Sequence, residues 1–298
     1  MLPGHQRYDY SPIVKRADYS WPDNKRLAFY IATNIEVFAF ETGIGPDPVG
    51  VNDLQTHRNF AWRDYGNRIG VWYLFDLYEE LGLPTSCLVN SYVYDHHPDI
   101  LERIRARGDD IVGHGRTNAE RQKGLWEIDE RRLIDDATQT IIKNEGKTPK
   151  GWLGGSVTET RVTLDLLKEA GYRYVLDWPC DDQPIWMKTR SGPILSVPYP
   201  FELNDIGQVI QRRHTPAQFA DMIVDQFDEM VRRSEDRPQV CALSLHTFIA
   251  GQPFRIPSLR KALKHIVEHP KKDSIWLTRA DAIAEHCYGM PAGLIPGS

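Results

Sequence analysis

The sequence predicts an α/β protein whose parallel sheet curls into a closed or nearly closed (β/α) barrel, with a doubly wound open sheet as the alternative. Short apolar runs alternate with longer amphipathic segments along most of the chain, as strands alternate with crossover helices. The alternation repeats about seven or eight times, which is enough to close a barrel. The 298 residues contain no Gly/Ser linker, charge block or internal repeat that would separate two domains.

In the first half of the chain, apolar runs are followed by segments with helical periodicity. The apolar run at 26–35 predicts a strand, and the Gly- and Pro-rich segment at 41–64 predicts a long polar loop. Gly82 can end the next helix in the left-handed conformation. The expected order is a strand at 26–35, a loop at 41–64, a helix at 67–81, a strand at 85–90, a helix at 98–107 and a strand at 110–113.

The second half continues the same alternation. Ile134, Ala137, Ile141 and Ile142 recur at the helical period, so they predict a helix at 129–145 with one buried face. Thr278 is a suitable N-cap for a last, short helix. The elements expected between them are a strand at Trp152, a helix at 160–170 that ends on Gly171, strands at 172–176 and 195–197, a helix at 216–233, a strand at 240–245, a helix at 256–269 and a strand at 274–277.

The first 24 residues are expected to form an extended arm ahead of a single domain at 25–298. The arm carries several aromatic residues and prolines. Proline lacks a backbone donor and suits an extended chain, whereas aromatic rings favour a surface on which to pack. The arm can therefore cover the edge of its own domain or reach a neighbouring subunit. Because it can reach a neighbouring subunit, we expect a homo-oligomer.

Composition and charge argue against several classes of function. The formal net charge is −5, without the basic excess that phosphate binding requires, so no nucleic-acid partner is expected. The N-terminus lacks the order of a signal peptide, and Asn34 and Glu36 interrupt the most apolar early stretch. We therefore expect a cytoplasmic protein with no membrane partner. The four cysteines form no CxxC pair and are expected to be small buried residues.

Polar side chains follow several of the apolar runs. Glu36, His114, Asp177 and His246 each stand at or just past the end of an expected strand. Because the carboxyl ends of parallel strands meet at one face of such a fold, we expect these side chains on the face where ligands bind. A polar residue at one strand end is ordinary, so it is the shared face that indicates a site. The same ends also carry Asn34, Asn118, Asp181 and Asp182.

Three of these positions suit catalysis or metal binding. Glu36 stands among apolar neighbours, and partial desolvation would suit a general base or a metal ligand; a surface salt bridge is the alternative. His114 and Asn118 are four positions apart and can share one face at the start of a helix, as metal ligands do. His114 could equally be a hydrogen-bonded residue at a strand end. His246 suits proton transfer or, alternatively, a hydrogen-bonded place in the core.

Taken together, these motifs resemble the polysaccharide deacetylase superfamily, and especially its branch that contains bacterial allantoinase, cyclic imide hydrolases and peptidoglycan deacetylase-like proteins. The resemblance runs from near Trp21 to near His286, and it implies a distorted (β/α)7 barrel with the motifs at its mouth. The segments that carry it are 34–36, 62–68, 114–118, 151–154, 177–178 and 243–246, which read Asn-Ile-Glu, Trp-Arg-Asp-Tyr-Gly-Asn-Arg, His-Gly-Arg-Thr-Asn, Gly-Trp-Leu-Gly, Asp-Trp and Leu-Ser-Leu-His.

The chain departs from the metal-dependent deacetylases of that family. Those enzymes pair two aspartates in the first motif and supply two histidines from the second, whereas here Asn34 and Asn118 replace an aspartate base and a histidine ligand. Trp152 and its neighbours replace the arginine of the third motif. Two alternatives remain for this site. It binds one divalent metal, zinc, through Glu36, His114 and Asn118, or it binds no metal, because one histidine and one carboxylate are few ligands for zinc. Sugar deacetylation is therefore less favoured than the fold implies.

The resemblance implies a hydrolase of non-peptide C–N bonds in a small cyclic amide or imide. In this hypothesis Glu36 and His114 activate water, His246 protonates the leaving nitrogen, and Asn118 contacts the substrate. Two rivals remain. One is a metal-dependent polysaccharide or peptidoglycan N-deacetylase, and the other is a non-catalytic module that binds carbohydrate or another ligand.

The same hypothesis assigns further side chains to a small-molecule substrate. Trp152 and Trp178 would form walls of the pocket, or else pack in the core. Arg68 or Arg116 would bind a carbonyl or carboxylate group of the substrate, or else form structural ion pairs or stay solvated. Asp177 would orient a catalytic histidine, as a carboxylate partner does.

Overall fold

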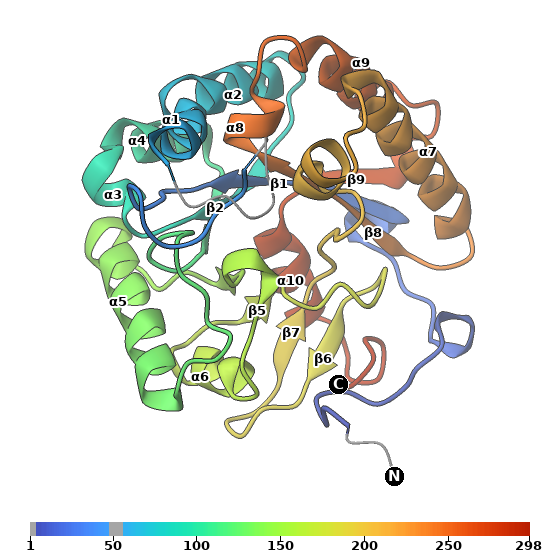
Figure 1. Cartoon of the computed structure of the whole chain (residues 1–298). Helices are drawn as coiled ribbons and strands as arrows, with labels where there is room; N and C mark the ends of the chain where they lie inside the picture. Colours follow the sequence, from blue (N-terminus) through green and yellow to red (C-terminus); the bar gives the residue numbers. More distant parts are fainter. Residues whose placement is uncertain (1–3, 48–55) are drawn as a thin grey trace.

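The alternating apolar and amphipathic segments form strands surrounded by helices (Figure 1). The computed structural model describes residues 4–47 and 56–298. Its strands are β1 (Leu27–Ile35), β2 (Thr85–Val89), β3 (Asp110–Gly113), β4 (Gly151–Trp152), β5 (Tyr174–Val175), β6 (Ile185–Met187), β7 (Ile194–Ser196), β8 (Gln239–His246) and β9 (Ile275–Thr278). Its α-helices are α1 (His57–Tyr65), α2 (Val71–Glu80), α3 (Val93–His96), α4 (Pro98–Arg107), α5 (Glu127–Glu145), α6 (Thr163–Glu169), α7 (Pro216–Ser234), α8 (Thr247–Ala250), α9 (Ile256–Val267) and α10 (Ala280–Tyr288).

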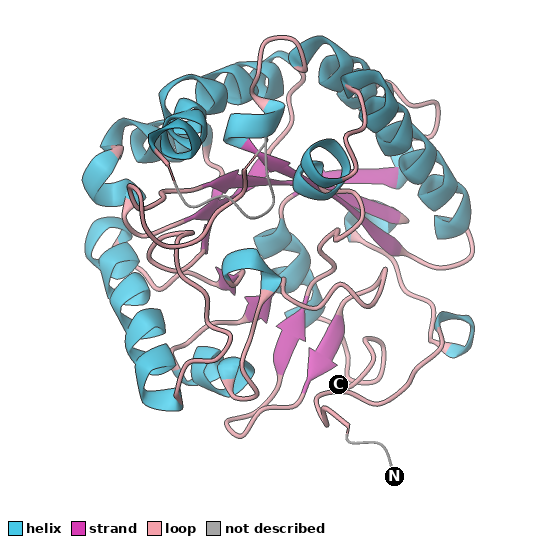
Figure 2. Cartoon of the chain, in the orientation of Figure 1, coloured by secondary structure: helices cyan, strands magenta, loops and turns pink. Residues whose placement is uncertain are grey.

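The strands form a single curled sheet, drawn in magenta in Figure 2. Their order is β6-β7-β5-β4-β3-β2-β1-β8, and β9 also pairs with β1. The pairs are parallel, apart from the antiparallel pair of β6 and β7. The loop after β7 reaches β8 through an isolated bridge between Asn204 and Ser244. The predicted α/β barrel is therefore confirmed, as a curled and mostly parallel sheet that forms a half-barrel.

Strand β1 shows how alternating side chains build a core on each side of the sheet. Leu27 and Phe29 pack in the cluster that includes apolar residues of α2, α7 and α9, whereas Ala28 and Tyr30 pack with residues of α10. Successive side chains of a strand face opposite sides, and all of β1 is buried, as expected where both faces of a parallel sheet are covered. Continuing the same alternation past the end of β1 places Glu36 on the side of Ala28 and Tyr30.

The N-terminal arm lies along its own chain. Arg7 contacts both carboxylate oxygens of Asp165, at 2.9 and 2.8 Å. Arg16 contacts both carboxylate oxygens of Asp181, at 2.7 and 2.5 Å. Trp21 is buried in the cluster that contains α10. These contacts within one chain hold Arg7, Arg16 and Trp21, whereas Tyr10 of the arm is 91% exposed. The homo-oligomer stays a prediction.

The expected elements and the observed ones differ mainly where segments are short. Helix α1 forms inside the segment expected as a loop, part of which lies outside the described residues, and the single-turn helices α3 and α8 and the strand β6 were not expected. Elements this short carry too few residues to show a period. Cys180 is exposed, in contrast to the other three cysteines, because it lies in the loop after β5. Within residues 4–47 and 56–298, the helices lack the combined length and apolar character needed to cross a bilayer.

A π-helix connects α1 and α2 and packs very closely against α8. This segment, η3, spans Gly66–Gly70. A Cβ atom added to Gly66 would lie 2.4 Å from Thr247 Oγ1, and one added to Gly70 would overlap the Thr247 carbonyl oxygen. Glycine is therefore required at both positions, and the contact holds the segment 62–68 beside the end of β8.

We expect Gly70→Ala to lower the free energy of unfolding by about 1–3 kcal/mol, because the new methyl group must displace backbone atoms of α8. Urea denaturation followed by circular dichroism measures this loss. The matched control is Gly289→Ala, whose Cβ would make an ordinary 3.5 Å contact with the His286 carbonyl oxygen. Equal stability of the two variants would contradict the close packing of η3 and α8.

Candidate functional site

The strand register brings polar side chains from three strands to one edge of the sheet. Asn34 of β1 pairs with His246 of β8, and Val89 of β2 pairs with Gly113 of β3. Because β3, β2, β1 and β8 are neighbours in that order, the residues that follow β1 and β3 lie near the end of β8. Glu36, His114 and His246 are therefore brought together, and each is buried.

Glu36 lies at the centre of this group. Its Oε1 atom accepts a hydrogen bond from Asn118 Nδ2 at 2.7 Å, and lies 3.3 Å from His114 Nε2 and 3.7 Å from His246 Nε2. Its Oε2 atom is buried and has no hydrogen-bond partner among the described residues. A carboxylate with one oxygen held and the other without a hydrogen bond is suited to accept a proton. These four side chains are the predicted site residues that the structure brings together.

The ring of His114 is held in one tautomer. Its Nδ1 atom lies 2.7 Å from the Leu153 carbonyl oxygen, which can only accept, so Nδ1 carries a proton and Nε2 faces Glu36. Asn90, at the end of β2, joins the two neighbouring strand ends. Its Oδ1 atom accepts from the Val37 backbone at 2.9 Å, and its Nδ2 atom donates to the His114 carbonyl oxygen. Asn90 thus fixes the spacing between Glu36 and His114.

Asp205 orients His246. One carboxylate oxygen lies 2.7 Å from His246 Nδ1, and the other accepts from the His246 backbone N–H at 2.8 Å, so Nε2 is directed toward Glu36. Burial lowers the pKa of His246, but the negative charges of Asp205 and Glu36 outweigh burial, so the pKa lies above its ordinary value. Asp205 was not predicted from the sequence, because it lies in an irregular segment after β7 with no period to mark it.

Asn34 lies beside the site without facing Glu36. Its Nδ2 atom donates to Ser244 Oγ and to the Leu245 carbonyl oxygen, both at 3.2 Å. Tyr199 closes this network, with its hydroxyl 2.6 Å from Ser244 Oγ. An amide is not a base, so the position that supplies an aspartate in the resembling deacetylases has a structural role here.

Asp177 does not orient a catalytic histidine, which corrects that expectation. Its Oδ1 atom accepts from the Gly154 backbone N–H at 2.7 Å, whereas the Nδ1 atoms of His114 and His246 are bonded to Leu153 and Asp205. Burial raises the pKa of Asp177 to about 7, against the lowering effects of the Gly154 hydrogen bond and the charge of His114.

Neither predicted tryptophan lines the cavity of about 280 Å³ that opens beside Glu36. Trp152 is 0% exposed and donates from its indole nitrogen to Gln122 at 3.2 Å, so it belongs to the core. Trp178 donates to Glu159 at 3.1 Å and packs against Tyr8 of the arm. The expectation of two tryptophan walls is therefore replaced by the core-packing alternative.

The two predicted arginines lie at the surface. The side chain of Arg68 is 72% exposed, and its guanidinium lies 4.0 Å from Asp64. Arg116 forms ion pairs with Glu120 at 2.9 Å and with Asp136 at 3.0 Å. Arg68 lies near a carboxylate one turn earlier, and Arg116 is paired with a carboxylate four residues later and with one on α5, so neither lines the cavity beside Glu36.

A cavity of about 280 Å³ opens beside Glu36. Its size is near the lower end for ligand pockets, so it suits a small molecule better than a polymer chain. The carboxylates of Glu36 and Asp64 face it together with two aromatic rings and two imidazoles. The full lining is Glu36, Val37, Phe38, Phe60, Asp64, Asn67, His96 and His97.

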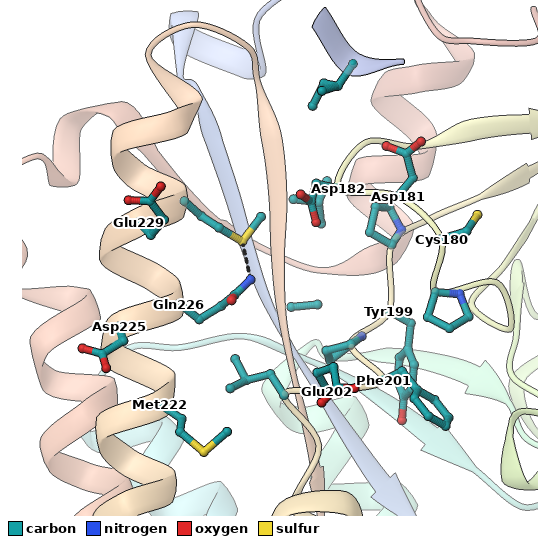
Figure 3. Close-up of a pocket in the computed structure, with 18 of the residues that line it drawn as sticks. Cys180, Asp181, Asp182, Tyr199, Phe201, Glu202, Met222, Asp225, Gln226 and Glu229 are labelled. Atoms are coloured by element: carbon teal, nitrogen blue, oxygen red, sulfur yellow. Dashed lines mark hydrogen bonds between the residues drawn. The ribbon is translucent and has the colours of Figure 1, made fainter. Parts of the chain in front are cut away.

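A larger cavity, of about 820 Å³, lies beside α7 (Figure 3). Acidic side chains approach it from α7 and from the loops after β5 and β7, and several are already ion-paired, as Asp181 is with Arg16 and Glu202 with Arg212. Its lining includes none of Glu36, His114 and His246. Glu36 lines the smaller cavity, although His114 and His246 do not, so the smaller cavity is the candidate substrate pocket. The acidic residues of the larger one are Asp181, Asp182, Glu202, Asp225 and Glu229.

The residues around Glu36 do not fit a zinc ion held by the protein. Asn118, the third expected ligand, turns its NH₂ group toward Glu36, and this orientation is fixed because a carboxylate only accepts. A catalytic zinc uses three protein ligands, and Glu36, His114 and His246 are not among the described groups of three whose donor atoms converge. Across the described ranges, converging donors from three His, Cys, Asp or Glu residues occur at Asp228, His265 and His269, in and after helices α7 and α9.

Comparison with known proteins identifies the fold. No family model matches the chain. The crystal structure of PuuE allantoinase aligns with a TM-score of 0.82 and 23% identity, over 95% of this chain and 98% of the allantoinase. A Pseudomonas aeruginosa PAO1 protein, provisionally named a polysaccharide deacetylase, aligns with a TM-score of 0.78 and 23% identity, over 90% of this chain and 93% of its own. A Schizosaccharomyces pombe protein with the same provisional name is 23% identical, over 89% of this chain and 91% of its own. The predicted resemblance is confirmed at the level of the fold.

The same fold occurs in a protein described as a pseudoenzyme. This Bacillus anthracis member of carbohydrate esterase family 4 aligns with a TM-score of 0.52 and 10% identity, over 88% of this chain and 66% of its own. A mutant of it is described as having restored enzymatic activity. The fold alone therefore does not decide between catalysis and binding, and the side chains at the strand ends must decide it.

Proposed function

Because the chain has the fold of the polysaccharide deacetylase superfamily, we propose that it hydrolyses a non-peptide C–N bond in a small cyclic amide or imide. The observation that carries the proposal is the arrangement of Glu36, His114 and His246 around one carboxylate oxygen, with Asp205 behind His246. Glu36, the general base, lines a cavity of about 280 Å³, and His246, the general acid, lies 3.7 Å from Glu36. Hydrolysis of a small ring requires such a base and acid.

Glu36 acts as the base in this proposal. Asn118 holds Oε1, which leaves Oε2 to take a proton from water while the water oxygen attacks the carbonyl carbon. The Asn118 amide positions the carboxylate, and His114 lies beside Oε1 with its Nδ1 atom bonded to Leu153. A positioned base typically contributes about 10²–10⁴-fold to the rate.

His246 acts as the acid. When the C–N bond of the tetrahedral intermediate breaks, the electron pair stays on nitrogen, and protonated Nε2 gives that nitrogen its proton. The carboxylates of Asp205 and Glu36 favour the protonated imidazole despite its burial. One water is consumed, the ring opens to a carboxylic acid and a free N–H group, and the proton on Glu36 returns to His246 through solvent.

Hydrolysis of an N-acetyl group on a polysaccharide is the second candidate. The provisional names of the Pseudomonas aeruginosa and Schizosaccharomyces pombe relatives favour it. The same base and acid would act on an acetamido group and release acetate. A non-catalytic binding module is the third candidate, and it gives no reason for Asp205 to hold the His246 ring toward Glu36.

We expect the purified protein to open hydantoin, succinimide or allantoin, and to do so at the same rate after treatment with a chelator. The reason is that the site supplies a base and an acid but too few ligands for zinc. Ring opening is followed by loss of ultraviolet absorbance, and acetate release is measured with an acetylated chitooligosaccharide. Glu36→Gln protein serves as the blank. Acetate release without ring opening would favour the second candidate, and loss of ring opening on chelation would restore the metal site.

A further inference from the structure

The polar lining of the cavity beside Glu36 consists of two carboxylates, one amide and two imidazoles. Asn67 Oδ1 and Glu36 Oε2 are both buried and have no hydrogen-bond partner in the part of the chain that the structure describes. Asp64 adds a second carboxylate, and no lysine or arginine appears among the described lining residues. The cavity is therefore suited to a ligand that brings donors.

The orientation of Asn67 is determined by its other contact. Its Nδ2 atom donates to the Glu36 backbone carbonyl at 2.7 Å, and a carbonyl oxygen only accepts, so the NH₂ group must lie on that side. Oδ1 then lies on the opposite side of the amide. Asn67 belongs to η3, whose close contact with α8 limits its movement. A buried acceptor in a fixed position favours a ligand atom that completes its hydrogen bond.

We propose that Asn67 determines specificity by accepting a hydrogen bond from a second N–H of the substrate, one that does not belong to the bond being broken. This rests on the proposed function, since it takes the cavity beside Glu36 as the substrate pocket. Rings that contain an N–CO–N unit offer such an N–H next to the scissile amide. A plain imide offers a CH₂ group at that position and leaves Asn67 Oδ1 unpaired. The carboxylate of Asp64 adds a preference against rings that carry a negative charge.

Hydantoin and succinimide test this proposal, because they differ only by N–H against CH₂ at one ring position. We expect Asn67→Ala to lower the ratio of kcat/KM for hydantoin to kcat/KM for succinimide by about 10-fold or more, which is the effect of one hydrogen bond to a buried acceptor. The intrinsic reactivities of the two rings cancel when the variant's ratio is divided by that of the wild type.

Two further variants separate specificity from structure. Asn67→Asp keeps an oxygen acceptor but loses the bond to the Glu36 carbonyl, so its overall rate should fall while the ratio stays near the wild-type value. Asn144→Ala, on the exposed face of α5, is the matched control and should change neither rate nor ratio. Thermal unfolding of each variant checks the fold. If Asn67→Ala does not fold, wild-type protein that accepts 1-methylhydantoin as well as hydantoin overturns the proposal.

The outcomes distinguish this inference from the proposed function. If Asn67→Ala slows both rings equally, Asn67 is only structural and the inference fails, whereas the proposed function stands. If the wild type opens neither ring, the proposed catalysis fails for these rings, and calorimetric binding of the same two compounds decides the inference. If the wild type binds hydantoin more tightly than succinimide and Asn67→Ala does not, the inference is supported. If the wild type binds the two compounds equally or binds neither, the inference is overturned.

Discussion

Glu36→Gln should lower kcat by about 10²–10⁴-fold while the protein stays folded. Glutamine has nearly the same shape as glutamate and keeps an oxygen that can accept from Asn118, but its amide cannot take a proton from water. KM should change little, because the substrate would lose a catalytic group rather than a large contact surface. Steady-state kinetics on the best ring substrate, with circular dichroism as the check on folding, measures the effect.

Glu80→Gln is the matched control for this variant. Glu80 is exposed on α2 and pairs with Arg260 at 3.1 Å, so loss of its charge removes a surface ion pair of small energy. Its kinetics should equal those of the wild type. If Glu36→Gln retained full activity, Glu36 would not be the base, and His114 Nε2, 3.3 Å from Glu36 Oε1, would be the next group to test.

Strand ends were the part of the site that the sequence could predict. An apolar run that stops at a polar residue places that residue at the carboxyl edge of a parallel sheet, whatever the later contacts are. Glu36, His114 and His246 were found in this way, and the register of β1, β2, β3 and β8 explains why they meet. Asn118 followed from its spacing to His114, and the structure places it on Glu36.

The groups that orient these side chains could not be found by the same reasoning. Asp205 and Asn67 lie in irregular or π-helical segments, where no period relates them to a strand end. Trp152 and Arg116 were predicted to contact the substrate, but the structure places Trp152 in the core and Arg116 in ion pairs. Each stands in or next to a motif of the resembling family, but the choice between pocket and core, or pocket and surface, depends on packing with distant segments such as α5 and the loop that holds Gln122.

The fold itself was predictable where the periods were long. The helices near 98–107, 129–145, 216–233 and 256–269 were expected within a few residues of their observed bounds. The curl of the sheet was not fixed by periodicity, which left an open sheet as the alternative. It depends instead on contacts such as the bridge from Asn204 to Ser244, which joins segments 40 residues apart.

Asp205→Asn should reduce activity most at high pH. His246 must be protonated to act as the acid, so activity in the wild type is present below the raised pKa of His246 and is lost as pH rises through it. Asparagine can still accept from Nδ1 but loses the bond that the other oxygen accepts from the His246 backbone N–H, and it removes the charge that opposes the effect of burial. The pKa of His246 should therefore fall, and the loss of activity should move to lower pH. A fall of one unit makes the variant about 10-fold less active than the wild type on the alkaline side.

A kcat against pH profile for both proteins measures this shift, and the two curves should converge at acidic pH, where His246 is protonated in each. Asp228→Asn is the matched control, because Asp228 lies 2.7 Å from His265 at the surface, so it removes a carboxylate from a histidine away from the site. Its profile should equal that of the wild type. A uniform loss at every pH in Asp205→Asn would mean that Asp205 only positions the ring. An unchanged profile with full activity would remove His246 from the role of acid and leave the leaving nitrogen to be protonated by solvent.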